Sequence, residues 1–284
     1  MFMDNDPDQK IPSQSTRCVS EPHQLSIGYG WHWFARGFRL FLAAPTGWAL
    51  NTMVFIVLVL FLSAIPVVGV VASSIMQTLL TAGAMYSCRV LSAGGEVRSS
   101  DLFHGFKHNS ANLIRFSMFS FLLYVLALVG ALVISAIAGV AEAVSSQFDP
   151  ENPQYTMAML FMALFYLVMI VPVMMATWFA PALIILNDKS VIQAVKLSFQ
   201  GCIKNIWPFA WYGIIALFLA LFIALIHLAL YSLFSGVTEI QQQTPAMFVS
   251  AVVLFVAVLV WVPVFWGGTY AAYDDIFVKN SIEV

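Results

Sequence analysis

The sequence predicts an all-α integral membrane protein of about six transmembrane helices, arranged as three hairpins that each follow a short amphipathic interfacial helix. Three observations carry this prediction: the composition, the spacing of the apolar runs and the distribution of the basic residues. Of the 284 residues, 61% are hydrophobic and only 9% are charged, whereas soluble domains carry about 25% charged residues. A bilayer accommodates such a chain, because its interior does not penalise exposed apolar side chains.

Six apolar runs are long enough to cross a bilayer, which requires roughly 20 residues per helix. They cover residues 48–65, 67–91, 112–141, 155–186, 206–234 and 246–270. Each second run of a pair carries a proline between β-branched residues, at its start (Pro66) or inside it (Pro172 and Pro263). Because proline frees a backbone carbonyl, we expect the two internal prolines to kink their helices.

An amphipathic segment precedes each pair of runs. In residues 31–41, Trp31, Phe34, Phe38 and Phe41 share one helical stripe, with basic residues on the other side, which is typical of a helix lying in the membrane interface. The polar stretch 90–110 precedes the second pair, and residues 191–202 precede the third. Each unit also has a Phe followed ten positions later by another aromatic residue, at Phe38, Phe106 and Phe199. This pattern favours a threefold repeat in which all units run in the same direction; chance resemblance among Phe-rich segments is the alternative.

The basic residues fix the predicted orientation. With six spans, all 12 Lys and Arg residues fall on one side of the membrane, and the opposite loops hold only acids. The positive-inside rule makes the basic side cytoplasmic, so both termini are predicted to be cytoplasmic. We divide the chain into a disordered cytoplasmic tail (1–28), a six-helix transmembrane domain (29–275) and a C-terminal cytoplasmic tail (276–284).

Two stretches resemble known bacterial membrane proteins. Residues 187–199 (NDKSVIQAVKLSF) with 204–209 (KNIWPF) are similar to the membrane domain that accompanies some glycerophosphoryl diester phosphodiesterases. Residues 30–33 (GWHW) and 37–41 (GFRLF) resemble the start of an uncharacterised proteobacterial six-helix inner-membrane family. The resemblance implies the bacterial cytoplasmic (inner) membrane as the location. It transfers no catalytic residue, and the soluble phosphodiesterase domain is absent from this sequence.

Few residues are candidates for chemistry. Asp101, His104 and His108 are spaced i, i+3 and i+7 on an expected cytoplasmic helix, where a carboxylate and two imidazoles can bind a metal or face a phosphate. A solvated helix face is the favoured interpretation, because three such residues on a polar face arise easily. Within the spans, His227 is the one ionisable side chain away from the ends, with Tyr231 one turn further. Its depth places it near the outer interface, where a structural role is the alternative.

Two other patterns concern transport and assembly. Gln77, Thr78, Thr81 and Thr177 are sparse candidates for a polar path through the bundle. Small residues recur every fourth position in the third span, a spacing that lets helix backbones approach closely either within the monomer or in a homo-oligomer. These residues are Ala127, Ala131, Ser135 and Gly139.

Three functions remain open at this point. The favoured one is a non-enzymatic inner-membrane protein that handles lipid or an amphiphilic small molecule, or serves as a scaffold for a partner. A channel or facilitator for a small solute is the second, and an enzyme acting on lipid headgroups is the third. We expect membrane lipids as partners, no nucleic acid, no catalytic or metal residues and no cofactor, since no nucleotide, zinc-hydrolase or serine-hydrolase motif is present.

Overall fold

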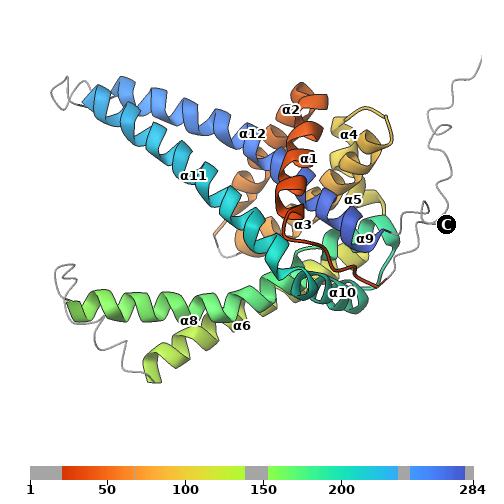
Figure 1. The fold of residues 1–284 in the computed structure, drawn as a ribbon, viewed down its shortest axis with the longest axis horizontal. Helices are drawn as coiled ribbons and strands as arrows, with labels where there is room; N and C mark the ends of the chain where they lie inside the picture. The colour runs from red at the N-terminus through yellow and green to blue at the C-terminus, as the bar shows by residue number, and fades with distance from the viewer. Residues whose placement is uncertain (1–20, 67, 138–152, 236–243, 279–284) are drawn as a thin grey trace, which may run out of the picture.

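The computed structural model describes residues 21–66, 68–137, 153–235 and 244–278, and in these ranges the chain is built from helices joined by short connections (Figure 1). Three hairpins carry the six helices that are long and apolar enough to cross a membrane. Their members are α2 (Pro45–Ser63) with α3 (Val68–Ser92), α6 (Ser110–Ile137) with α8 (Pro153–Thr177), and α11 (Ile206–Ser235) with α12 (Thr244–Phe277). The predicted fold class is therefore confirmed.

Short helices gather at one end of the hairpins and form what we call the basal layer. They are α1 (Tyr29–Ala43), α4 (Ser99–Leu102), α5 (His104–Lys107), α9 (Ala180–Asn187) and α10 (Val191–Lys204). The stretch before the second hairpin is not one helix, because Phe103 separates α4 from α5. All Lys and Arg residues of the described ranges lie in this layer, beside it, or within two turns of the basal end of a span.

The basal layer joins the hairpins in a cycle. The α4–α5 pair packs against α3, and α10 packs against α8 and α9, so each of these elements covers the returning span of the hairpin that precedes it. The first of the described helices, α1, packs along α12 of the last hairpin. The first and last hairpins are thereby held together by a contact between the two ends of the described chain.

A small residue at an equivalent place makes two of these contacts possible. Gly37 and Gly105 each stand directly before the Phe of the sequence repeat. A Cβ atom on Gly37 would lie 2.4 Å from the carbonyl oxygen of Val264, and one on Gly105 would lie 2.3 Å from that of Leu79. Since both distances are shorter than any real Cβ contact, only glycine permits these helices to pack so closely.

Ser198 occupies the same place in the third unit, and its hydroxyl explains why the fourth span is interrupted. It donates to the carbonyl of Met175 at 2.8 Å and accepts from the backbone N–H of Phe179 at 3.0 Å. A continuous helix would join those two backbone groups directly. The chain turns at Trp178 and Phe179, and α9 then begins at Ala180, with Pro181 in its first turn, where an N–H would have no partner within the helix.

Neither internal proline ends its helix, and the kinks expected at these two positions stay a prediction. Pro66 lies in the turn between α2 and α3, and the helices α8 and α12 continue through Pro172 and Pro263. The break in the fourth span comes before Pro181 instead, so the single predicted span over residues 155–186 is divided into α8 and α9.

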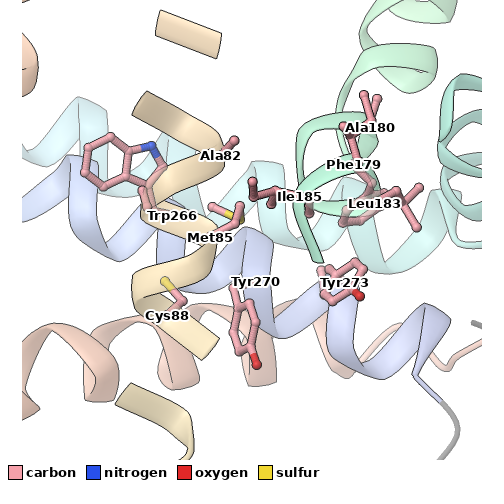
Figure 2. Packing of buried hydrophobic residues seen from close by; sticks show 14 of the residues in the cluster. Ala82, Met85, Cys88, Phe179, Ala180, Leu183, Ile185, Trp266, Tyr270 and Tyr273 are labelled. Carbon is pink, nitrogen blue, oxygen red and sulfur yellow. The ribbon is translucent and has the colours of Figure 1, made fainter. Parts of the chain in front are cut away.

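The core lies at the basal end and surrounds α9. Figure 2 shows Phe179 and Leu183 from this region facing side chains of α3 and α12, among them Met85 and Tyr273. Every residue of α9 from Ala180 to Ile185 is buried. Further from this core the two longest hairpins, α6–α8 and α11–α12, diverge (Figure 1) and do not pack along each other in the described residues.

Both ends of the described chain are attached to the basal layer. The amide side chain of Asn205 accepts from the backbone N–H of Leu25 at 2.8 Å and donates to the carbonyl of His23 at 2.8 Å. The backbone N–H of His23 donates to the carbonyl of Ile276, and Phe277 is fully buried. Ordered contacts thus extend beyond the 29–275 boundaries expected for the helical domain, and residues 1–20 and 279–284 lie outside the described ranges.

Candidate functional site

A cavity of about 370 Å³ lies between the three hairpins, and we call it the hairpin cavity. Its walls come from α3, α6, α12 and the region around the α8–α9 break. On α3 it extends from Ser74, six residues after the helix begins, to Met85, seven residues before it ends. At about 1.5 Å per residue, the cavity is roughly 10 Å from either end of α3 and therefore near the middle of the span.

The exposure of the lining residues shows which way the cavity opens. On α3, Gln77 is exposed and Met85 is buried; on α6, Tyr124 is exposed and Ser117 is buried. In both helices the buried member is the one nearer the basal end. The cavity is therefore closed by the core below it and open toward the space where the hairpins diverge.

Polar side chains line the cavity on all four of its walls although the spans are strongly apolar. Ser74, Thr78 and Thr81 follow one face of α3 at i, i+4 and i+7, and Ser117 and Ser120 follow one face of α6. The remaining polar lining residues are Gln77, Tyr124, Thr177, Trp178 and Thr269. Small hydroxyl residues at helical spacing place a polar strip on a helix without introducing a charge.

Most of these hydroxyls bond to their own helix. Thr78 donates to the carbonyl of Ser74 at 3.0 Å, and Ser120 donates to the carbonyl of Ser117 at 2.9 Å. Thr177 lies 3.0 Å from the Tyr124 hydroxyl, which links α8 to α6 at the cavity mouth. This back-bonding explains how the polar strip is tolerated inside an apolar bundle.

Two buried polar atoms of the cavity lack hydrogen-bond partners among the described residues: Nε1 of Trp178 and Oγ1 of Thr269. Thr269 is 8% exposed. The Trp178 ring packs against Phe265 with centroids 5.5 Å apart, and against Phe209 at 5.8 Å, so it lies where the second and third hairpins meet. A buried polar atom without a partner costs about 1–3 kcal/mol, so a ligand group that reaches either atom would be stabilised by a hydrogen bond.

The four residues expected to form a polar path are brought together here. Gln77, Thr78, Thr81 and Thr177 all line the hairpin cavity. Sequence reasoning missed the polar residues contributed by α6, and it missed Trp178 and Thr269. The i, i+3 and i+7 spacing of Ser117, Ser120 and Tyr124 was a usable signal for the α6 wall, whereas the α8–α9 break that positions Trp178 depends on the distant Ser198.

The structure brings together two of the predicted trio Asp101, His104 and His108, since the rings of His104 and His108 lie 5.6 Å apart. Asp101 lies on α4 and accepts from the backbone N–H of Arg98 at 3.2 Å, whereas His104 begins α5. His108 follows the end of α5 in an extended conformation, so the expected single helical face is wrong. No group of three potential metal ligands is close enough to hold an ion in the described part of the chain.

Besides contacting each other, the two histidines each have a further local partner. His104 stacks on Tyr86 with ring centroids 3.7 Å apart, while His108 Nε2 lies 3.0 Å from Oδ1 of Asp188. Burial lowers the pKa of His104, and the neighbouring His108 and Arg89 lower it further. At neutral pH His104 is therefore an uncharged ring that packs α5 onto α3.

The other predicted positions lie away from the cavity. His227 is half-buried on α11, and its Nδ1 has no partner among the described residues; the side chain of Tyr231 lies outside the described residues. Ala127, Ala131 and Ser135 are buried in the isolated chain, where α6 packs along α8. Gly139 lies outside the described ranges, and a homo-oligomer stays a prediction.

A charged contact holds the first and last hairpins together in the basal layer. Arg36 of α1 donates to Oδ2 of Asp274 at 2.7 Å, and Trp33 Nε1 donates to Oδ2 of Asp275 at 3.0 Å. Burial alone would lower the pKa of Arg36, but its hydrogen bond and ion pair with Asp274 raise it overall. The contact fixes α1 on the basal end of α12, because Asp274 and Asp275 follow the last cavity residue of α12, Thr269, by five and six positions.

Comparison with curated proteins finds a relative in Burkholderia thailandensis that is named as a probable inner membrane protein. The two chains are 24% identical over 264 residues, which cover 89% of this chain and 93% of the relative. No protein-family profile matches the chain, and no solved structure matches it.

The relative's name and the six apolar helices together indicate an inner-membrane protein. They agree with the resemblance to an uncharacterised membrane protein family. The similarity to the membrane domain of glycerophosphoryl diester phosphodiesterases stays a prediction, because none of these three comparisons bears on it.

Proposed function

We propose that this inner-membrane protein binds a lipid or an amphiphilic small molecule in the hairpin cavity. The observation that carries the proposal is a mid-span cavity with polar side chains on an otherwise apolar lining, which opens between two diverging apolar hairpins. An amphiphile suits both parts, because its polar group finds hydrogen-bond partners while its chains stay beside apolar helix faces. A polar group in the hydrocarbon region is costly without such partners.

A channel is less well supported by the same cavity. Its polar lining ends at Met85 and Ala182, which are both 1% exposed, and the apolar core around α9 lies beyond them. A solute path would have to cross this core. An enzyme is also less well supported, since Asp101, His104 and His108 form no three-ligand group and the described cavity lining contains no Asp, Glu, His, Lys or Arg.

We also propose that the basal layer faces the cytoplasm. The support is the location of every described Lys and Arg in or beside this layer, which the positive-inside rule places on the cytoplasmic side. The cavity would then be closed toward the cytoplasm and open toward the lipid and the outer half of the membrane. A lipid entering from the side fits this arrangement.

Lipid retention by the purified protein tests the proposal. Native mass spectrometry of the protein released from detergent is expected to show a bound lipid on the wild type. Thr78→Leu, which places a bulkier apolar group in the cavity, is expected to reduce that bound fraction. Ser73→Leu is the matched control, because Ser73 is on the same helix and outside the cavity lining. Equal retention by the wild type and Thr78→Leu would argue against the cavity as the site.

A further inference from the structure

The two unpartnered atoms of the hairpin cavity specify what kind of group it binds. An indole N–H only donates, and a threonine hydroxyl both donates and accepts. Trp178 contacts Phe265, and Thr269 stands one helical turn after Phe265 on α12. The two residues therefore come from adjacent walls of the cavity, where the second hairpin meets the third.

The other hydroxyls leave acceptor positions in the cavity. Ser74 donates to the carbonyl of Val71 at 2.8 Å, and Thr78 and Ser120 also donate to carbonyls of their own helices. Because their protons are engaged, these oxygens offer mainly lone pairs to a ligand. A ligand that suits this cavity therefore has oxygen acceptors for Trp178 Nε1 and the Thr269 hydroxyl. It also has a hydroxyl that can donate to the engaged serine and threonine oxygens.

No charge in the cavity balances a charged ligand. The described lining contains no Lys, Arg, His, Asp or Glu, and Arg36 lies in the basal layer beyond the buried Thr269 and Tyr270. Moving a phosphate or a carboxylate to this depth without a counter-ion costs several kcal/mol or more. A phospholipid headgroup is therefore a poor occupant, even though phospholipids surround the protein.

We infer that the hairpin cavity selects the uncharged glycerol and ester region of a neutral lipid of the diacylglycerol type. This inference rests on the proposed function and specifies its ligand class. Trp178 Nε1 donates to an ester carbonyl, and Thr269 bonds either a second carbonyl or the free hydroxyl. The acyl chains leave between α8 and α12, where these helices diverge. The volume is at the lower end of the range for small-molecule pockets, which suits a lipid's polar region but not its chains.

Photolabelling in nanodiscs of phosphatidylethanolamine tests the inference. One probe is a diacylglycerol and the other a phosphatidylglycerol, each with a diazirine beside the ester of one acyl chain. Trp178→Phe removes the N–H and keeps the ring, while Thr269→Val removes the hydroxyl and keeps the shape. Thr52→Val is the matched control, because Thr52 is fully buried and bonds to the carbonyl of Trp48 outside the cavity.

The expected result is diacylglycerol labelling of peptides that line the cavity, competed by unlabelled diacylglycerol and not by phosphatidylglycerol. Each cavity variant is expected to weaken labelling about tenfold, which corresponds to one hydrogen bond of about 1.4 kcal/mol, while Thr52→Val labels like the wild type. Equal labelling by phosphatidylglycerol, or unchanged labelling of both variants, would overturn the neutral-lipid inference and leave lipid binding standing. Absence of cavity labelling by either probe would overturn the proposed function as well.

Discussion

Close contact between the first hairpin and the basal layer depends on Gly83. A Cβ atom at this position would lie 1.9 Å from the carbonyl oxygen of Leu102 and 2.9 Å from that of Asp101. Ordinary van der Waals contact begins at 3.4 Å. The substitution Gly83→Ala therefore requires α3 and α4 to separate by about 1.5 Å, because a backbone carbonyl cannot rotate away as a side chain does.

The size of the effect follows from two opposing terms. Overpacking in a close-packed interior costs about 1–3 kcal/mol, and the backbone contact puts this site at the upper end. Alanine regains about 1 kcal/mol relative to glycine in a helix. We expect a net loss of about 1–2 kcal/mol, which at roughly 2–4 °C per kcal/mol lowers the Tm by about 2–8 °C.

Thermal unfolding in detergent, followed by tryptophan fluorescence, measures this loss. Gly130→Ala is the matched control, because it is also within a membrane-spanning helix and a Cβ atom there meets no atom within 4 Å. The control is expected to have an unchanged or slightly higher Tm, for the same helix-propensity reason. If Gly83→Ala unfolds at or above the temperature of Gly130→Ala, the close packing of α3 against α4 is wrong.

Three further predictions concern the basal layer. Arg36→Met leaves the carboxylate of Asp274 without its cation and is expected to cost about 1.5–3 kcal/mol, with Arg36→Lys intermediate; equal Tm values for all three proteins would contradict this ion pair. Burial lowers the pKa of His104 in the folded protein. As the pH drops through the ordinary histidine pKa of about 6.5, the unfolded chain therefore binds more protons than the folded protein, and the folded protein loses stability. His104→Phe keeps the ring stacked on Tyr86 and should flatten this part of a Tm profile between about pH 7.5 and 5.5; a profile as steep as that of the wild type would refute the assignment. Burial raises the pKa of the Cys202 thiol to about 12, so peptide mass spectrometry after maleimide treatment should find it modified only once the protein unfolds, and labelling of the folded protein would contradict its burial.

The spans were predictable because their signal is local. Apolar runs of sufficient length and a one-sided distribution of Lys and Arg fix the hairpins without any knowledge of tertiary contacts. The amphipathic helix α1 was predicted for the same reason, although its buried face was not. Trp33 is fully buried and bonds to Asp275, which follows it by 242 positions, and no periodicity within residues 31–41 points to that partner.

The cavity was predictable only in part. Gln77, Thr78, Thr81 and Thr177 stood out as polar residues in apolar spans, but nothing in their spacing showed that they would meet. Their meeting depends on the break between α8 and α9, which Ser198 stabilises from a different helix. The same non-local contact places Trp178 in the cavity wall, so no sequence pattern predicted this residue, which we propose binds the ligand.

The occupancy of the hairpin cavity in a bilayer is the most direct test of the account. A cryo-EM map of the wild-type protein in lipid nanodiscs is expected to show an elongated density that enters between α8 and α12. Its inner end should lie within hydrogen-bonding distance of Trp178 Nε1 and Thr269 Oγ1, with no phosphate-sized peak there. A cavity filled by repacked side chains, or one that holds only water, would contradict the proposal that this protein binds lipid.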